Sequence, residues 1–165
     1  MTATRHTPSR TFVTARRRLA FGDAVAGLVL MPDGRYLMQL RDDRGDIFYP
    51  DHWGLFGGSV DPGESPIAAI RRELEEEIGV VPRRIRFFLR SEIDYRRLGS
   101  RVLFRNFYEV RLSKDEAGRL RLGEGAEMRA FRADVLLQLK AVVPYDSYAV
   151  WLHAFRRRFR ARRSR

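Results

Sequence analysis

Residues 58–80 read GSVDPGESPIAAIRRELEEEIGV, and this stretch decides the fold. The Asp-Pro-Gly segment at 61–63 is typical of a turn. Ser65 suits an N-cap, Pro66 suits the first helical position, and Gly79 is a natural stop. The pattern therefore predicts a helix over residues 66–78. Its apolar residues recur at helical spacing and are expected to form the buried side: Ile67, Ile70, Leu74 and Ile78.

Three acidic residues of this helix, Glu73, Glu76 and Glu77, follow i, i+3, i+4 spacing and project from one neighbouring face. Like-charge pairs at this spacing destabilise an isolated helix by about 0.2–0.5 kcal/mol each, and a bound cation would relieve that repulsion. Hard cations such as Mg²⁺ take oxygen ligands and share them with substrate phosphates. Beside the glycine-rich WGLFGG at 53–58, the cluster suits a metal bridging a diphosphate. Taken alone, a run of glutamates is more typical of a solvated helix face than of a metal site.

Fixed spacing separates this stretch from a generic acidic helix. It fits G-x5-E-x7-R-E-U-x-E-E-x-G-U, where U is bulky and apolar, and a chance match is on the order of one in a billion per start site. The pattern resembles the Nudix box of hydrolases that cleave a nucleoside diphosphate linked to another group. Phe56 stands where many Nudix sequences have proline. The matching residues are Gly58, Glu64, Arg72, Glu73, Leu74, Glu76, Glu77, Gly79 and Val80.

The resemblance implies an α/β fold, the Nudix α/β/α sandwich with a mixed β-sheet. It also implies a Mg²⁺ cofactor, with Mn²⁺ as a substitute, and attack by water on one phosphorus of a diphosphate. One glutamate of the cluster would orient or deprotonate the water. Arg72 would pair with a motif glutamate, and Glu64 would support the loop. The implied metal ligands are Glu73, Glu76, Glu77 and the backbone carbonyl of Gly58.

Charge is uneven along the 165 residues, which carry a formal net charge of +11. Residues 1–20 hold five arginines and residues 156–165 hold seven, with no acid in either segment. The remaining 20 basic and 21 acidic residues leave the core near −1. We therefore expect a single domain over 21–155, flanked by a basic N-terminal arm (1–20) and an Arg-rich C-terminal tail (156–165). Such arms can contact nucleic acid or an anionic surface, or can be solvated ends.

Cysteine is absent, which excludes disulfides, thiolate catalysis and a zinc–thiolate site. No run of 18 apolar residues predicts a membrane span. These features favour a cytoplasmic protein, although the N-terminal arm also has the composition of an organelle transit peptide. The sequence does not determine the oligomeric state, and a homodimer is compatible with it.

The other apolar runs predict strands before and after the acidic helix, followed by terminal helices. The last helix is expected to bury Val150, Trp151 and Ala154. The predicted strands cover 24–31, 36–41, 84–93, 102–112 and 127–131, and the predicted helices cover 133–139 and 146–159.

Substrate-binding residues are harder to identify than the acidic cluster. Aromatic rings can stack on any base, and the planar forks of arginines can bind phosphates. Each of these residues is also an ordinary choice for core packing or a solvated surface. The candidates are Phe48, Tyr49, Trp53, Phe56 and Tyr95 for a base, and Arg41, with Arg44 and Arg96, for phosphates. Glu124 and Glu127 are candidates for an extra acid over the site.

Three functions are compatible with these features. The favoured one is a Mg²⁺-dependent pyrophosphohydrolase of a small nucleotide, such as a nucleotide sugar or nucleoside triphosphate. The second is a hydrolase of RNA 5′ ends that uses the arginine arms. The third is a non-catalytic Nudix module that senses a ligand, which the complete carboxylate set disfavours.

Overall fold

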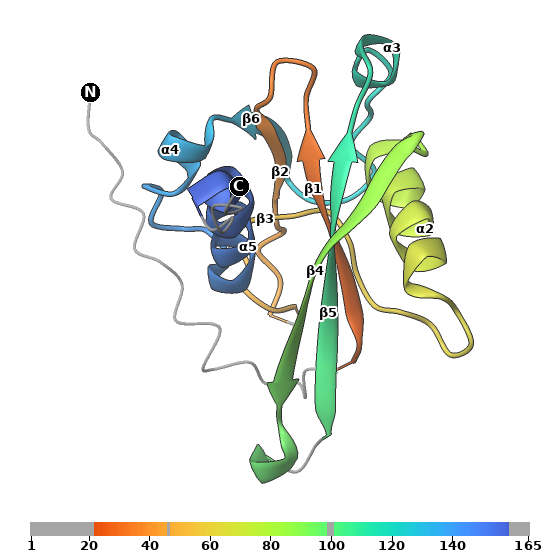
Figure 1. Ribbon diagram of the computed structural model, residues 1–165, viewed down its shortest axis with the longest axis vertical. Helices are drawn as coiled ribbons and strands as arrows, with labels where there is room; N and C mark the ends of the chain where they lie inside the picture. Colours follow the sequence, from red (N-terminus) through yellow and green to blue (C-terminus); the bar gives the residue numbers. More distant parts are fainter. Residues whose placement is uncertain (1–21, 46, 99–100, 159–165) are drawn as a thin grey trace, which may run out of the picture.

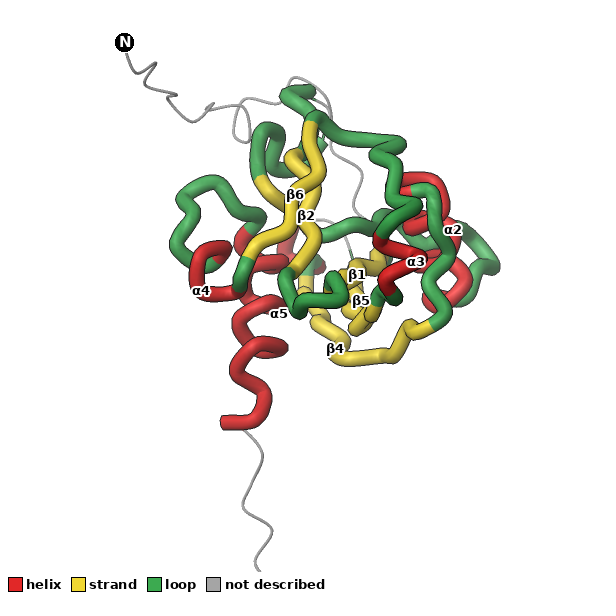
Figure 2. Tube along the Cα trace, turned by 90° about the horizontal axis from the view of Figure 1, so that it is seen from above, coloured by secondary structure: helices red, strands yellow, loops and turns green. Residues whose placement is uncertain are grey.

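The computed structural model describes residues 22–45, 47–98 and 101–158. A mixed sheet lies between helix α2 (Pro66–Ile78) on one side and helices α4 (Ala133–Leu136) and α5 (Pro144–Phe155) on the other (Figures 1 and 2). This arrangement confirms the predicted α/β sandwich with a mixed sheet. The predicted N-terminal arm and residues 159–165 lie outside the described residues.

The strands follow the order β3-β2-β1-β5-β4, and β6 pairs with β2. Strand β1 pairs with β5 in parallel, and the other pairings are antiparallel. The bounds are β1 Ala24–Leu30, β2 Tyr36–Leu40, β3 Trp53–Gly54, β4 Arg84–Asp94, β5 Val102–Arg111 and β6 Glu127–Phe131. Short elements complete the fold: helix α3 Lys114–Ala117 and the 3-10 turns η1 Arg96–Leu98 and η2 Arg156–Arg158.

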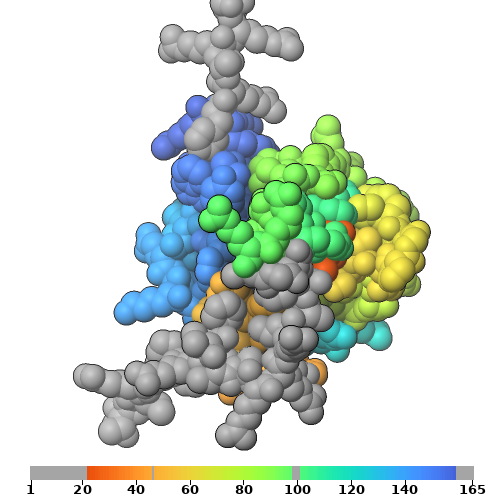
Figure 3. Space-filling view, turned by 90° about the horizontal axis from the view of Figure 1, so that it is seen from below, coloured from red at the N-terminus to blue at the C-terminus, as the bar shows by residue number. Residues whose placement is uncertain are grey.

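Strands β4 and β5 form one long hairpin. Their register runs from Arg84 opposite Arg111 to Asp94 opposite Val102. The lower end of this hairpin extends well beyond the helices (Figure 1). Seen from below, it stands between α5 and α2 (Figure 3).

A gap in the β1–β2 ladder makes room for the glycine-rich segment. These two strands pair only at their adjoining ends, where Val29 faces Leu37 and Leu30 faces Tyr36. Farther along β1, isolated bridges join Gly27 to Phe56 and Ala24 to Ser59. The segment between β3 and α2 therefore lies along β1, which places Gly57 and Gly58 beside that interior strand.

The α2 face of the sheet is packed by Ile70, Leu74 and Ile78, as predicted, against residues that include Val25. Ile67 was predicted to be buried, and this is wrong, because its exposed fraction is 40%. The fully buried residue near the start of the helix is instead Ala69, two positions farther along.

The opposite face is covered by α5, which begins two residues earlier than predicted and ends at Phe155. Val150 is fully buried there, and Ala154 is partly buried against the same core. The prediction that Trp151 is buried is wrong, since it is 41% exposed. Successive helical residues turn by about 100°, so the residue after the inward-facing Val150 points away from the sheet.

Two further differences from the predictions concern where α4 ends and where the C-terminal tail begins. Helix α4 ends at Leu136, three residues before its predicted end. The segment expected to be a tail begins with η2, so the regular structure continues through Arg158. Within the described part of the chain, no helix is long and apolar enough to cross a membrane.

Candidate active site

The caps of α2 set how its carboxylates are presented. The Ser65 Oγ accepts the Ala68 N–H at 3.3 Å, and Pro66 occupies the first turn. Gly79 adopts a left-handed conformation (φ 71°) and donates its N–H to the Glu75 carbonyl at 3.0 Å. The predicted start and stop of this helix are therefore confirmed.

Glu77 lies on the buried side of α2. Its Oε1 accepts a hydrogen bond from Gln39 Nε2 at 2.9 Å, and its Oε2 accepts the Gly57 N–H at 2.6 Å. Burial raises the pKa of the Glu77 carboxyl to about 7, although both hydrogen bonds favour the charged form. The negative charges of Glu73 and Glu124 add to the rise in this pKa. Two neutral hydrogen-bond donors therefore fix the Glu77 carboxylate, but no cation among the described residues balances its charge.

Glu73 fits against the glycine-rich segment. A Cβ added to Gly58 would lie 2.7 Å from both carboxylate oxygens of Glu73, a distance that real Cβ atoms do not tolerate. Glycine at position 58 thus allows the Glu73 carboxylate to lie this close to the backbone. Its carbonyl, a predicted metal ligand, accepts the Val25 N–H at 2.9 Å. Gly57 is required for another reason, because its φ is 130° and its Cβ would lie 2.4 Å from the Val25 carbonyl oxygen.

Arg72 contacts three of the motif glutamates, Glu64, Glu73 and Glu76. Its Nε and Nη2 donate to the two oxygens of Glu64 at 3.1 and 2.9 Å, a bidentate pair. Its Nη1 donates to Glu73 Oε1 at 2.7 Å. These bonds raise the pKa of Arg72. Burial also raises the pKa of Glu73, against the effect of Arg72. Arg72 therefore fixes the orientation of Glu73 from the loop side.

Glu76 completes the acidic face. Its side chain is 53% exposed, and Arg72 Nη1 approaches its Oε2 at 3.4 Å. The three glutamates therefore differ in environment although their spacing is regular. Glu77 is buried, Glu73 is largely shielded by its neighbours, and Glu76 faces solvent.

Glu124 is brought to the site by two glycines. A Cβ on Gly123 would lie 2.0 Å from the Glu76 carbonyl oxygen, so the backbone passes directly over the end of α2. Gly125 has φ 86°, and its Cβ would lie 3.0 Å from Gln39 Oε1. The Glu124 charge raises the pKa of both Glu73 and Glu77. Of the two extra acids considered, Glu127 instead pairs with Arg129 at 2.8 Å.

Comparison with known proteins agrees with this geometry. A family model described as NUDIX domain matches residues 20–159. The chain belongs to the Nudix family. The MutT protein of Methanosarcina mazei Go1 shares the Nudix fold over 88% of this chain and 99% of its own, with a TM-score of 0.67 and 18% identity. The NUDIX domain of Shewanella oneidensis NrtR, solved in complex with ADP ribose, covers 92% and 99%, with a TM-score of 0.62 and 17% identity.

A curated relative shares a shorter stretch of sequence. The nucleoside triphosphatase NudI of Escherichia coli O1:K1 is 46% identical over 52 residues, which cover 31% of this chain and 36% of that protein. The chain thus spans about a third of the length of the curated relatives that it matches.

Nudix proteins generally use divalent metals, so the fit of Mg²⁺ to these residues can be tested. Among the described residues, no three acidic or histidine side chains already surround one point as a metal cage would. Mg²⁺ rarely needs such a cage, because it is usually held by one or two carboxylates, several waters and substrate phosphates. Glu73, Glu76, Glu77 and Glu124 lie near one another and supply that donor set, and Arg72 pairs with Glu73 and Glu76 among them. The residues therefore fit a Mg²⁺ ion that is completed by substrate.

A second group of side chains lies where the segment between β2 and β3 meets the start of α5. The Tyr49 ring packs against the rings of Tyr145 and His52 with centroid distances of 5.6 and 5.7 Å. Burial raises the pKa of Tyr49, and the neighbouring Tyr95 adds to the effect. Arg41 donates from Nε to the Phe48 carbonyl at 2.8 Å. The structure thus brings Arg41, Phe48, Tyr49 and Tyr95 into one neighbourhood.

Asp146 anchors this neighbourhood to the sheet. Its Oδ2 accepts the Leu55 N–H at 3.0 Å, and its Oδ1 accepts from Arg105 Nη2 at 3.2 Å. Burial raises the pKa of the Asp146 carboxyl, and Arg105 opposes that rise. The guanidinium of Arg105 also lies 4.9 Å from the centroid of the Tyr145 ring.

Two of the predicted base-stacking residues are placed elsewhere. Phe56 is fully buried in the core on the α2 side, so the prediction that its ring stacks on a base is wrong. Trp53 is half-buried, and its ring packs edge-on against Phe131 at 4.8 Å, with Arg129 above it at 5.4 Å.

Sequence reasoning missed Gln39, Arg105 and Asp146. Each had a signal, because a polar residue in an apolar run needs a buried partner. Gln39 interrupts YLMQL in β2, Arg105 interrupts VLFRNF in β5, and Asp146 lies in the first turn of the largely apolar α5. The sequence alone does not show which partners these residues meet.

Proposed function

We propose that this chain is a Mg²⁺-dependent pyrophosphohydrolase of a small nucleotide, in which water attacks one phosphorus of a diphosphate. The observation that supports it most is the fit of Glu73 against Gly58 next to the buried Glu77. A domain that only binds a ligand gains nothing from confining carboxylates in this way. The same arrangement is what a water-activating metal site requires.

The side chains divide the work by environment. Glu73, Glu76 and Glu77 hold the metal, which when bound neutralises phosphoryl oxygens and lowers the pKa of attacking water. Arg72 keeps Glu73 oriented, and Glu64 keeps Arg72 in place. Gln39 and the Gly57 N–H hold the Glu77 carboxylate where burial alone would favour its protonated form. Placement and electrostatics therefore carry the rate.

Glu124 is our candidate for the group that accepts the proton of the attacking water. It is exposed, on a loop that the glycines at 123 and 125 hold over the end of α2. Glu127 is less suited, because its carboxylate is paired with Arg129.

A nucleoside triphosphate is the substrate class that we favour. The shared stretch with NudI, which is described as a nucleoside triphosphatase, supports this choice. In this chain Tyr49, Tyr95 and Tyr145 would face the base, and Arg41 and Arg105 would supply positive charge near the phosphates.

The test is a screen of nucleoside triphosphates, nucleotide sugars and dinucleotides with Mg²⁺, read by released pyrophosphate, or by phosphate after added phosphatase. We expect hydrolysis of one small class, and its loss with excess chelator. Glu124→Gln should lower kcat far more than the matched Glu127→Gln. Activity that persists in excess chelator, or no hydrolysis of any nucleotide, would overturn the proposal.

A further inference from the structure

A second charged site lies on the hairpin, and it shares no residue with the candidate active site. A hollow of about 420 Å³ opens where β4 begins and β5 ends. We call it the arginine cleft, and its lining residues are Arg83, Arg84, Ile85, Arg86, Glu109 and Arg111.

The arginine cleft contains more positive charge than its own acid can balance. In the β4–β5 register, Arg84 stands directly opposite Arg111, a like-charge pair that destabilises a sheet. Glu109 is the one acid of the lining. The Glu109 carboxylate already pairs with Arg111 Nε at 2.7 Å, His153 Nε2 at 2.6 Å and Arg156 Nη2 at 3.3 Å. Arg86 stands opposite Glu109 in the same register, but within the described residues no ion pair joins Arg84 or Arg86 to an acid.

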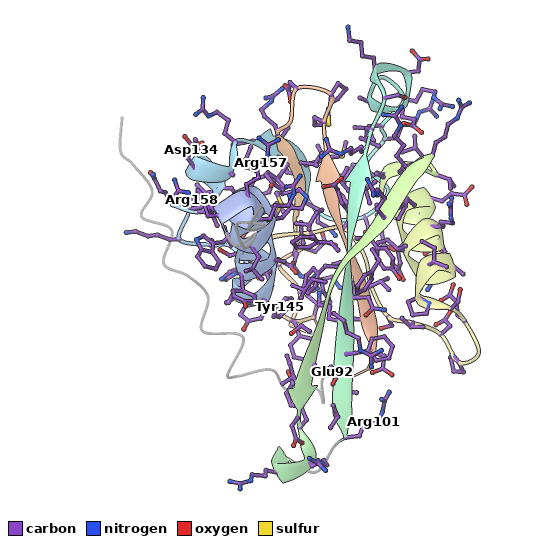
Figure 4. The ribbon with its side chains drawn as sticks, in the orientation of Figure 1. Glu92, Arg101, Asp134, Tyr145, Arg157 and Arg158 are labelled. Atoms are coloured by element: carbon purple, nitrogen blue, oxygen red, sulfur yellow. The ribbon has the colours of Figure 1, made fainter. Side chains whose placement is uncertain are left out.

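The cleft continues onto the end of α5. Arg156 links the two, because its guanidinium contacts Glu109 and donates to the His153 carbonyl at 2.6 Å. Arg157 and Arg158 follow at the same end of the helix, away from Tyr145 at its start (Figure 4). The sequence then adds four more arginines between residues 160 and 165.

Aromatic rings line the outward face of the same helix. Tyr148 is 55% exposed and Trp151 is 41% exposed. Their rings stack with centroids 6.2 Å apart and planes 25° apart, and Phe155 follows at 6.5 Å from Trp151. The Arg158 guanidinium lies 5.1 Å above the Phe155 ring. The exposed rings of Tyr148 and Trp151 and the half-buried ring of Phe155 follow one another about one helical turn apart. Together they form a surface on which flat apolar groups can stack.

We propose that the arginine cleft and the aromatic face of α5 together bind single-stranded nucleic acid. The backbone phosphates would lie on the arginine cleft and the bases on the rings of α5. Proteins that bind single strands combine a cationic groove with aromatic platforms, and both parts are present here. The cations are all arginines, whose planar forks match phosphate oxygens. This inference goes beyond the proposed hydrolysis of a small nucleotide and does not depend on it.

Other polyanions fit the surface less well. An acidic peptide would use the arginines but has no regular need for stacked rings. An anionic membrane would use the arginines and rings but favours a broad apolar helix face. On the outward side of α5, the exposed large hydrophobic residues are Tyr148 and Trp151.

Binding is measured by fluorescence anisotropy with a labelled single-stranded RNA of about 12 nucleotides, within the usual site size of about 4–16. The full chain is used in excess chelator, so that loss of hydrolysis cannot be mistaken for loss of binding. We expect Arg84→Ala/Arg86→Ala to weaken binding and to reduce the salt slope by about 1.4, from about 0.7 per phosphate contact. Trp151→Ala should weaken binding about fivefold or more.

The matched control is Arg35→Ala/Arg132→Ala, which removes the same charge from two exposed arginines paired with Asp33 and Asp134. It should bind RNA nearly as the unmodified chain does. Neither double variant should change hydrolysis of a small nucleotide. The proposal is overturned if the cleft variant and the control weaken binding equally, or if duplex binds as well as single strand. Binding to anionic vesicles or to a polyglutamate peptide without binding to RNA would also overturn it.

Discussion

The α2 site and the arginine cleft each bring several like charges together, but the two regions hold those charges differently. Both crowd like charges that the chain itself does not balance. In the acidic site, carboxylates are shielded and held by backbone N–H groups, Gln39 and Arg72. In the cleft, Arg84 and Arg86 are exposed on a strand. The difference agrees with the ligands proposed for the two sites, because a small ion and a reacting phosphorus need fixed geometry, whereas exposed guanidinium groups can bind a flexible polyanion.

The largest effect should follow a change to the fixed acidic site. Glu77→Gln removes a buried charge, and we expect turnover to fall at least about a hundredfold, or roughly 2.7 kcal/mol. Glu76→Gln should lower turnover similarly and leave stability unchanged, because its side chain is exposed. Steady-state kinetics at saturating Mg²⁺ measure both.

Glu75→Gln is the matched control, since Glu75 occupies a free position of the motif and faces solvent. Equal damage from this control would mean that the helix register is wrong.

A methyl group at Gly58 tests how closely the acidic site must be held. In Gly58→Ala the new Cβ would meet both Glu73 oxygens at 2.7 Å, so the carboxylate must move. A displacement of about 1 Å can cost up to about a hundredfold, so we expect a tenfold to hundredfold fall in kcat. The melting temperature should change little, because the obstacle is the end of a side chain.

Two neighbours give the contrast. Gly57→Ala should lower the melting temperature, because its Cβ would meet the Val25 carbonyl oxygen and its φ is 130°. Ser59→Ala should leave both kcat and stability near those of the unmodified chain, since its side chain is exposed. Loss of stability in Gly58→Ala as large as in Gly57→Ala would contradict this division.

The cleft's single acid should make stability depend on pH. Burial disfavours the charged form of Glu109, but Arg111 and His153 outweigh it and lower the pKa to about 2. A carboxyl with a depressed pKa stabilises the fold above its unfolded pKa, and that contribution is lost as pH falls. Between pH 7 and pH 4 the expected loss is about 0.8 kcal/mol. Burial lowers the pKa of His153, which acts in the same direction below its ordinary pKa.

Urea unfolding at several pH values measures this contribution. In Glu109→Gln the part assigned to Glu109 should disappear, and the unfolding free energy should fall less between pH 7 and pH 4. An unchanged pH dependence would mean that this carboxyl is not paired as the structure shows.

The smallest effect should follow shortening of the chain end. The segment predicted to be a C-terminal tail (156–165) begins with Arg156, which contacts Glu109 and the His153 carbonyl and so belongs to the packed domain. Deletion of 159–165 therefore gives the cleaner test. For a small nucleotide, kcat/KM should change less than about threefold, or roughly 0.65 kcal/mol. RNA affinity and its salt dependence should fall. A large loss of activity on the small nucleotide would mean that the end of the chain reaches the active site.

The sequence by itself determined the acidic helix. Ser65, Pro66 and Gly79 fix its ends through local capping, and the spacing of the glutamates fixes which side they share. Such features depend on neighbours within a few residues, so they can be read without the fold. The family, the mixed sheet and most strand bounds followed from the same kind of local pattern.

The tertiary structure decided which residues meet across the sheet. Local pattern placed Ile67 and Trp151 inside, whereas packing placed them outside, because the direction of a helix face depends on the sheet that it covers. Gln39 meets Glu77, and Arg105 meets Asp146, only because distant strands and helices are brought together. The arginine cleft arose in the same way, since the β4–β5 register sets Arg84 against Arg111. Contacts between residues far apart in the chain depend on three-dimensional packing, which no short-range pattern specifies.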